Sequence, residues 1–240
     1  MHFILVDTAN AQGCIALYRD SQLLQVANHP TGEDSSSWLL PAVRRLLSDA
    51  GLSLTYLDAY AVCSGPGSFT GLRVGLTTVK AWAEIFEKPI VAVSRLDALA
   101  CQTPLDAAST PRFVATYLDA RRNQVFAALF DPQGVPVWPE AVLGLANLLT
   151  SVDRTCGSTP VAWRTPDPQL LGYELLWASR QSKGDTLDAI EPPFAAQLGA
   201  LAYRKLQSGQ TTDAISLDAN YVRRSDAELF WKDHASAVKA

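Results

Sequence analysis

The sequence has few of the residues that build metal centres. Histidine occurs only as His2, His29 and His234, and no two of them are four residues apart. Cysteine occurs four times, without a Cys-x-x-Cys pair and without a histidine at ligand spacing. Zinc sites and histidine-rich metallohydrolase centres need such closely spaced ligands, so the sequence argues against both. The Gly-x-Ser-x-Gly and His-Glu-x-x-His motifs of hydrolases are also absent.

Charge and long apolar runs are scarce as well. Charged residues make up 18% of the chain, against about 25% in typical soluble domains. This shortfall fits either a surface covered by a partner or a surface rich in uncharged polar residues. The net charge of −4 (20 basic and 24 acidic residues) argues against autonomous nucleic-acid binding. The apolar runs are far shorter than a membrane span or a signal-peptide core, so we expect a soluble, reduced, cytoplasmic protein.

Alternating strand and helix patterns fill the first part of the chain, and a hydrophobic content of 48% excludes intrinsic disorder. The patterns predict strands at 2–7, 14–18, 22–27, 59–64 and 90–94, and helices at 35–50, 71–87 and 95–102. Asp34 is placed to cap the first helix, Gly51 to end it, and Pro41 to kink it or delay its start. Strands alternating with helices predict an α/β fold.

The strand pattern starts again after a small, polar, proline-containing segment at 103–111, which we expect to be a linker. An apolar strand, Phe113–Leu118, ends at Asp119, and after a polar turn a second strand follows at 125–130. The opening of the chain has the same order: a strand ending at Asp7, a polar turn and a second strand. This similarity predicts an internal repeat, with two ordinary hairpins as the alternative.

The rest of the chain has weaker patterns, with prolines and glycines that predict long loops. The expected elements are helices at 139–149 and 193–207, a strand within 155–163, loops over 164–192, a strand or extended segment at 217–223 and a tail at 226–240. This part of the chain is less readable than the first.

A glycine-rich segment at residues 64–75 connects a strand to a helix. Backbone N–H groups at such a place can hold an anion such as phosphate. No Gly-Lys-Ser/Thr follows, so the segment is not a P-loop, and its spacing differs from that of the Rossmann fingerprint. A tight turn with close helix packing is the alternative. Asp7 also has two interpretations, as a turn cap or as part of a phosphate or Mg²⁺ site, and Asp119 is its counterpart in the repeat.

The helix predicted at 71–87 has two apolar sides. One consists of Leu72, Leu76, Val79, Ala83 and Phe86, and the other of Gly71, Gly75, Thr78, Trp82 and Ile85, flanked by Val74 and Ala81. This surface is wider than one sheet contact needs. Gly71 and Gly75 allow another backbone to come close, so we expect the second side to pack on another helix. That helix belongs either to another subunit or to this chain.

Four segments resemble the TsaB (YeaZ) family: FILVDTA, SGPGSFTGLRVGLTTVKAWA, YLDARRNQVFAALF and NYVRR. The resemblance covers residues 2–131 and 218–231. It implies an α/β fold of two ribonuclease-H-like lobes of the actin, hexokinase and Hsp70 (ASKHA) type, in agreement with the internal repeat. We place the first lobe at residues 1–105 and the second lobe, with the tail, at 106–240. The resemblance also implies a subunit of the bacterial machinery that makes threonylcarbamoyladenosine in tRNA.

The same resemblance implies a non-catalytic role. The related transferase TsaD carries a His-x-x-x-His metal pair on an early helix, and the matching helix here, Asp34–Ala50, has no histidine. We therefore expect no metal, no cofactor and no catalysis by this chain alone, which would make it an inactive homologue of the M22 peptidases. The remnants of a nucleotide site would be Asp7, Gly65, Gly67 and Ser68. The alternative is an autonomous small ATP-dependent phosphotransferase of the same fold, with Asp7 and Asp119 around Mg²⁺.

The partners that the resemblance implies are TsaD, the ATPase TsaE and a second copy of the chain. The family pairs with TsaD through the early helices of the first lobe, forms a homodimer with the same helices when alone, and contacts tRNA only through the complex. The expected interface residues are Trp38, Leu39, Ala42, Val43, Leu46, Gly71, Gly75, Thr78, Val79 and Trp82. Gly75→Arg or Val79→Asp is then expected to abolish TsaD binding while the monomer stays folded.

Overall fold

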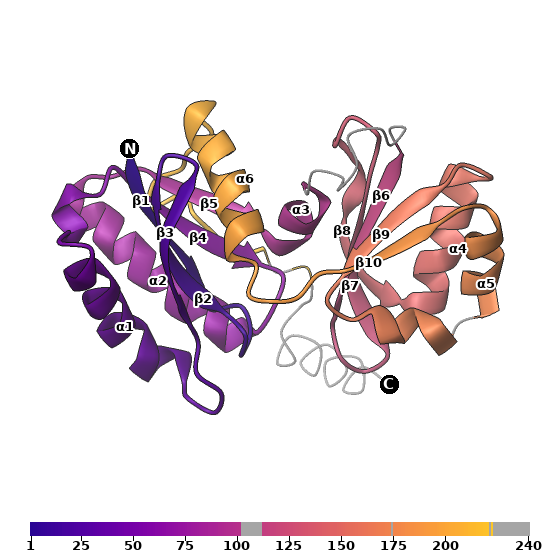
Figure 1. The fold of residues 1–240 in the computed structure, drawn as a ribbon, viewed down its shortest axis with the longest axis horizontal. Coiled ribbons are helices and arrows are strands. Elements are labelled where there is room, and N and C mark those ends of the chain that lie inside the picture. The colour runs from indigo at the N-terminus through magenta and orange to yellow at the C-terminus, as the bar shows by residue number, and fades with distance from the viewer. Residues whose placement is uncertain (102–111, 174, 221, 223–240) are drawn as a thin grey trace, which may run out of the picture.

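Two five-stranded sheets, side by side, form the framework of the molecule (Figure 1). The computed structural model describes residues 1–101, 112–173, 175–220 and 222. The first sheet consists of β1 (His2–Asp7), β2 (Cys14–Arg19), β3 (Gln22–Asn28), β4 (Ala59–Gly65) and β5 (Ile90–Ser94). The second consists of β6 (Phe113–Asp119), β7 (Gln124–Phe130), β8 (Pro136–Gly144), β9 (Val161–Thr165) and β10 (Thr186–Ala189).

The two sheets have the same connectivity. Their strand orders are β3-β2-β1-β4-β5 and β8-β7-β6-β9-β10. In each sheet the first three strands pair antiparallel, and the last two continue the sheet in parallel. The predicted repeat is therefore confirmed, and so is the fold class of two ribonuclease-H-like lobes.

The central strand β1 is buried on both of its faces. Phe3 and Leu5 belong to one core cluster, which extends into the second lobe, and Ile4 and Val6 belong to another. Successive side chains of a strand point to opposite faces of the sheet, which divides the four residues in this way. All four are fully buried. An unbroken apolar run is typical of a strand with both faces covered.

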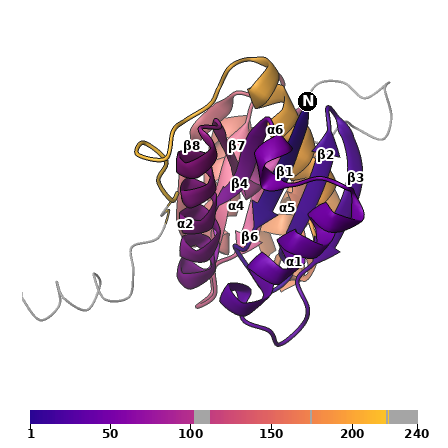
Figure 2. The same ribbon diagram turned by 90° about the vertical axis from the view of Figure 1, so that its left-hand side faces the viewer.

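Helices supply that cover (Figures 1 and 2). One face of the first sheet carries α1 and α2 and the other carries α3 and α6, whereas α4 and α5 lie over the second sheet. The bounds are α1 (Ser35–Asp49), α2 (Phe69–Phe86), α3 (Arg95–Ala100), α4 (Leu145–Cys156), α5 (Leu175–Ser182) and α6 (Ala195–Gln207), with 3₁₀ turns η1 (Leu54–Tyr56) and η2 (Pro168–Tyr173).

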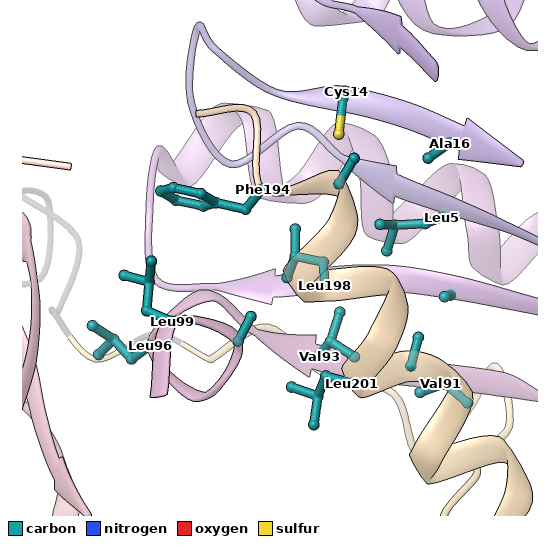
Figure 3. Packing of buried hydrophobic residues seen from close by; sticks show 14 of the residues in the cluster. Leu5, Cys14, Ala16, Val91, Val93, Leu96, Leu99, Phe194, Leu198 and Leu201 are labelled. Carbon is teal, nitrogen blue, oxygen red and sulfur yellow. The ribbon is translucent and has the colours of Figure 1, made fainter. Parts of the chain in front are cut away.

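Helix α6 returns to the first lobe after the chain has built the second. Its Leu198 and Leu201 pack in one cluster with Leu5 and Val93 (Figure 3). The predicted boundary between the lobes and the predicted linker both lie within 102–111, outside the described residues, so both stay predictions. The segment assigned to the second lobe thus contributes a helix to the core of the first.

The main error of the sequence analysis concerns the strand β8. A helix is predicted at 139–149, but the structure continues β8 to Gly144, and α4 begins only at Leu145. Ala141 and Val142 pair with Ala127 and Phe126 of β7. The strand lies at the edge of the sheet, where a proline such as Pro139 is tolerated. Pairing with a distant strand therefore decides the conformation against the local pattern.

Other differences are smaller. Residues 164–192 contain η2, α5 and β10 besides loops. The strand expected within 155–163 is β9, which begins inside that range at Val161 and ends after it at Thr165. At 217–220 there is no strand, and the rest of the NYVRR segment except Val222 lies outside the described residues, as does the predicted tail. The remaining predicted strands and helices are confirmed with small shifts at their ends.

The first two helices show how local caps set their limits. Helix α2 begins at Phe69, two residues before the predicted start, because Ser68 Oγ accepts a hydrogen bond of 3.3 Å from Gly71 N. Helix α1 is capped at Asp34 as predicted, although the Asp34 side chain makes no cap bond. Pro41 lies inside α1 and does not delay its start, whereas the predicted kink stays a prediction.

Three of the four cysteines, Cys14, Cys63 and Cys156, are buried. Burial raises the pKa of the Cys156 thiol to about 11 and also raises the pKa of the Cys14 and Cys63 thiols. Within the described ranges, no helix combines the length and the apolarity needed to cross a membrane.

Candidate functional site

The glycine-rich segment after β4 packs against the loop that follows β1. Gly67 precedes α2, and Gly71 and Gly75 lie one turn apart on it. A β-carbon at Gly67 would overlap the Ala9 backbone, one at Gly71 the Thr8 carbonyl oxygen, and one at Gly75 the Thr8 hydroxyl. These glycines therefore allow α2 to pack closely on the loop after β1, which is the alternative that the sequence left open.

Hydrogen bonds across this contact use the donors that an anion would need. The backbone N–H of Ser68 donates to Ala9 O over 2.6 Å, and that of Gly71 donates to Ser68 Oγ. The Thr8 hydroxyl donates to Gly71 O over 2.7 Å. These bonds dock α2 on β1. Anion binding at Gly67 and Ser68 stays a prediction that this contact does not support.

Asp7 is fully buried and acts inside the first lobe. Its Oδ1 accepts a hydrogen bond of 2.9 Å from Ala9 N, which is the turn-capping role. Its Oδ2 lies 3.7 Å from Arg95 Nε, and the Arg95 side chain is also buried. A Mg²⁺ ion needs accessible carboxylate oxygens, and Asp7 offers none to solvent.

A cleft of about 730 Å³ separates the two lobes. Its first-lobe wall includes Gly67, Ser68 and Arg95, and its second-lobe wall includes Asp119 and Asp167. Of the predicted nucleotide-site residues, the structure therefore brings Gly67 and Ser68 to the cleft. Asp7 is buried and is not one of the residues that line the cleft.

Gly65 allows two backbone segments to come close together next to the cleft. Its φ of 125° is a conformation that L side chains rarely adopt, and a β-carbon there would lie 3.1 Å from Asn220 O. The backbone N–H of Asn220 donates to Ser64 O over 2.8 Å. Gly65 thus admits the segment that follows α6, a close approach that needs glycine at this position.

Two acidic groups of the second-lobe wall, Asp119 and Asp167, are engaged within that lobe. Asp119 Oδ1 accepts a hydrogen bond of 2.7 Å from Arg121 N, and Asp119 Oδ2 lies 3.4 Å from Arg121 Nη1. The Asp119 N–H donates to Asp167 Oδ2 over 3.0 Å. In the described part of the chain, no group of three His, Cys, Asp or Glu side chains is arranged to hold a metal ion. Asp119 and Asp167 therefore already have partners within the second lobe.

The residues predicted to face a partner lie mostly in the core of this chain. All of them except Thr78 are buried. Trp38 packs edge-to-face on His29, with ring centroids 4.7 Å apart, and Trp82 packs on Tyr60 at 5.7 Å. The helix-packing interpretation of Gly71 and Gly75 is wrong, because both lie against Thr8.

A different set of side chains forms the exposed face of α1 and α2. Val74, Thr78, Ala81 and Ile85 follow 4-3-4 spacing and make one stripe on α2. Val74 and Thr78 are half-buried, Ala81 is exposed, and Ile85 is 70% exposed. On α1, Leu40 is 56% exposed. The sequence places Ile85 beside Thr78, but it does not reveal which of the two apolar sides the sheet takes.

This arrangement changes which variants can test an interface. Val79 is fully buried, and any side chain at Gly75 meets Thr8. Gly75→Arg and Val79→Asp would disrupt the core, so we no longer expect either variant to leave the monomer folded. Variants at exposed residues such as Ile85 avoid this problem.

Comparison with known proteins places the chain in a family. The family model described as TsaD, tRNA N6-adenosine threonylcarbamoyltransferase, matches residues 29–155. The tRNA threonylcarbamoyladenosine biosynthesis protein TsaB of Escherichia coli is 31% identical over 97% of this chain and 97% of the relative. The chain belongs to the TsaB (YeaZ) family. The TsaB protein of Bacillus subtilis is 29% identical over 96% of this chain and 98% of its own length.

Solved structures agree with the family and with the fold. YeaZ from Pseudomonas aeruginosa is 28% identical, superimposes with a TM-score of 0.72, and is matched over 92% of this chain and 99% of its own. A ROK hexokinase from Thermus thermophilus has 13% identity and a TM-score of 0.54 over 86% of this chain and 100% of its own, a likeness of fold alone. The TsaB family and the two-lobe fold thus have independent support.

Proposed function

We propose that this chain is a non-catalytic subunit of tRNA threonylcarbamoyladenosine biosynthesis that binds and activates TsaD. Relatives matched over nearly their whole length carry the name of that biosynthesis, which supports the pathway. TsaD itself would transfer the threonylcarbamoyl group to the adenosine beside the anticodon. TsaE joins the complex, and tRNA is contacted only through it, in keeping with the chain's net charge of −4.

The exposed stripe on α2 is the observation that carries the proposal. Val74, Thr78, Ala81 and Ile85, with Leu40 of α1, leave apolar surface uncovered on helices whose inner sides are already buried. A small-and-apolar stripe at this spacing suits packing against another helix. An apolar face of TsaD that covers this stripe would be held in one conformation, and this is the proposed basis of activation. In the isolated chain, a second copy would occupy the same face.

The burial of the Asp7 carboxylate supports the proposal that this chain is non-catalytic. Its two oxygens face Ala9 N and Arg95, so a reacting group in the cleft cannot reach them. The first turn of α2 is docked on Thr8 and Ala9 instead of being open to a phosphate. These contacts favour a lobe that presents a binding surface to a partner over a lobe that binds a nucleotide.

Reconstituted tRNA modification tests the function. TsaD, TsaE, the adenylate-forming enzyme, ATP, threonine, bicarbonate and unmodified tRNA are combined with and without this chain. Modification that depends on this chain, together with no modification when TsaD is left out, supports the proposal. Equal modification without this chain would overturn it.

Variants at the stripe test the interface. Ile85→Asp and Ala81→Arg are expected to weaken TsaD binding at least tenfold with an unchanged Tm, because both residues are exposed in the free chain. Val135→Asp is the matched control, since Val135 is 56% exposed in the turn before β8. Normal TsaD binding by both stripe variants would show that the interface lies elsewhere.

A further inference from the structure

Helix α3 lies between the two lobes and packs against elements of both (Figure 1). The body of α3 packs on both lobes. Leu96 and Leu99 are fully buried in a cluster that includes α6 of the first lobe and strands β6 and β7 of the second. The guanidinium of Arg95 lies 4.8 Å from the centre of the Phe194 ring, and Arg95 Nε lies 3.7 Å from Asp7 Oδ2.

The N-terminal end of α3 is held by a carboxylate from the second lobe. Ser94 Oγ accepts hydrogen bonds from Leu96 N (3.1 Å) and Asp97 N (3.4 Å), and its hydroxyl donates to Glu140 Oε1 of β8. Glu140 Oε2 accepts a second hydrogen bond of 2.6 Å from Asn220 Nδ2. One side chain of the second lobe thus binds two segments that belong to the first.

The C-terminal end of α3 is held by a cation from the second lobe. Arg164 of β9 is 5% exposed, and its Nη1 donates to Ala100 O over 2.8 Å and to Leu99 O over 3.4 Å. The last carbonyls of a helix have no partners within the helix and carry partial negative charge, so a guanidinium is well suited to them. Asp188 Oδ2, 3.5 Å from Arg164 Nε, orients the arginine from the adjacent strand.

We propose that α3 is a strut that fixes the separation of the two lobes. Glu140 at one end and Arg164 at the other are roughly a helix length apart, so together they oppose both opening and twisting of the cleft. The chain also crosses between the lobes a second time, between β10 and α6, which adds a covalent tie. The cleft therefore keeps one width in the isolated chain, with or without a nucleotide, and this holds independently of which partner the chain binds.

Pulsed electron paramagnetic resonance between spin labels on the two lobes tests the strut. Labels are placed at Gln22→Cys in β3 and Arg154→Cys in α4, two exposed positions within regular elements. The exposed Cys101 is changed to Ser, since the other cysteines are buried. Labelled chain is diluted with unlabelled chain so that distances between copies do not contribute.

The full chain is expected to give one narrow distance distribution that Mg-ATP leaves unchanged. The double variant Glu140→Ala with Arg164→Met is expected to broaden it about twofold. The matched control, Glu84→Ala with Arg204→Met, removes the same two kinds of side chain from exposed positions away from α3 and is expected to change nothing. A broad or two-peaked distribution in the unmodified chain, or an unchanged width in the double variant, would overturn the proposal.

A second measurement covers the case in which the double variant does not fold. Glu140→Gln alone can keep both bonds: its Oε1 accepts from the Ser94 hydroxyl, and its Nε2 donates to Asn220 Oδ1 once the Asn220 amide turns over. It is therefore expected to keep the narrow distribution. Glu140→Ala alone loses both bonds and is expected to broaden it. Distance distributions of equal width in these two single variants would also overturn the proposal.

Discussion

The Thr8 hydroxyl donates to the Gly71 carbonyl over 2.7 Å, while the Thr8 carbonyl oxygen lies against the α-carbon of Gly71. One residue of the β1–β2 loop therefore fixes α2 by a hydrogen bond and by a contact that leaves no room for a side chain. The glycine-rich segment is a helix-docking device built from backbone. Its similarity to a phosphate loop is limited to its composition and its place between a strand and a helix.

Gly71→Ala is expected to lower the free energy of unfolding by about 1–3 kcal/mol, because the new methyl group forces α2 away from Thr8. Urea unfolding followed by circular dichroism measures the change. Gly172→Ala is the control: Gly172 has open space around its α-carbon and ordinary φ, so its variant should stay within about 0.5 kcal/mol of the parent. Equal stability of the two variants would contradict the docking role.

Gly199 and Tyr18 form a second contact of this kind, between α6 and β2. A β-carbon at Gly199 would overlap the Tyr18 ring, and that ring is stacked on Phe3 with centroids 4.8 Å apart, so it cannot turn aside. Gly199→Ala is expected to destabilise the fold by about 1–3 kcal/mol. Tyr18→Phe removes only the hydroxyl that donates to Ala195 O, and should cost about 0.5–1.5 kcal/mol. A smaller loss from Gly199→Ala than from Tyr18→Phe would contradict this contact.

The buried ion pair of Arg180 and Asp185 organises the second lobe. Arg180 donates to both Asp185 oxygens over 2.8 Å and to Gly157 O and Thr159 O, and both side chains of the pair are almost fully buried. Arg180→Met leaves Asp185 charged and without its cation, at an expected cost of about 3–5 kcal/mol in the free energy of unfolding.

The neighbouring Lys183 provides the control for that prediction. Its ion pair with Asp153 is partly exposed, with 29% and 45% of the two side chains accessible. Lys183→Met should therefore cost less than about 1 kcal/mol. Losses of similar size in Arg180→Met and Lys183→Met, measured by chemical denaturation, would show that burial does not set the strength of these pairs.

Glu140 is expected to make stability depend on pH. Burial raises the pKa of Glu140, and Asp97 raises it further, while bonds from Ser94 and Asn220 and the charge of Lys205 oppose the rise. Because the folded pKa lies above the unfolded value, this contribution is fully present below about pH 4.5 and is lost as pH rises through the folded pKa.

Glu140→Gln removes this titration. The stability of the variant relative to the parent should therefore increase as the pH rises above about 4.5. Denaturation midpoints at several pH values measure this difference. A difference that does not change with pH, or that favours the parent more as pH rises, would contradict the raised pKa.

Elements buried on both sides could be read from the sequence. The run from Phe3 to Val6 identifies β1, and the repeated order of strand, aspartate, turn and strand identifies the second lobe. Both signals are local, because each depends only on residues next to one another in the chain. The family resemblance rests on segments of this kind.

What the sequence could not supply are contacts between distant residues. Glu140 meets Ser94 across 46 positions, and Arg164 meets Ala100 across 64. The choice of β8 as a strand depends on pairing with β7, and the inner side of α2 depends on where Thr8 lies. For that reason the residues predicted to form the interface lie mostly on the buried sides of α1 and α2.

On the ribosome, the first lobe cannot be completed in the order in which it is made. The face of its sheet that carries Phe3 and Leu5 is covered by α6, which ends at Gln207. Domains usually fold as they emerge, beginning with the N-terminal one. Here the second lobe leaves the ribosome before the first is closed, so the nascent chain keeps apolar surface exposed through most of its synthesis.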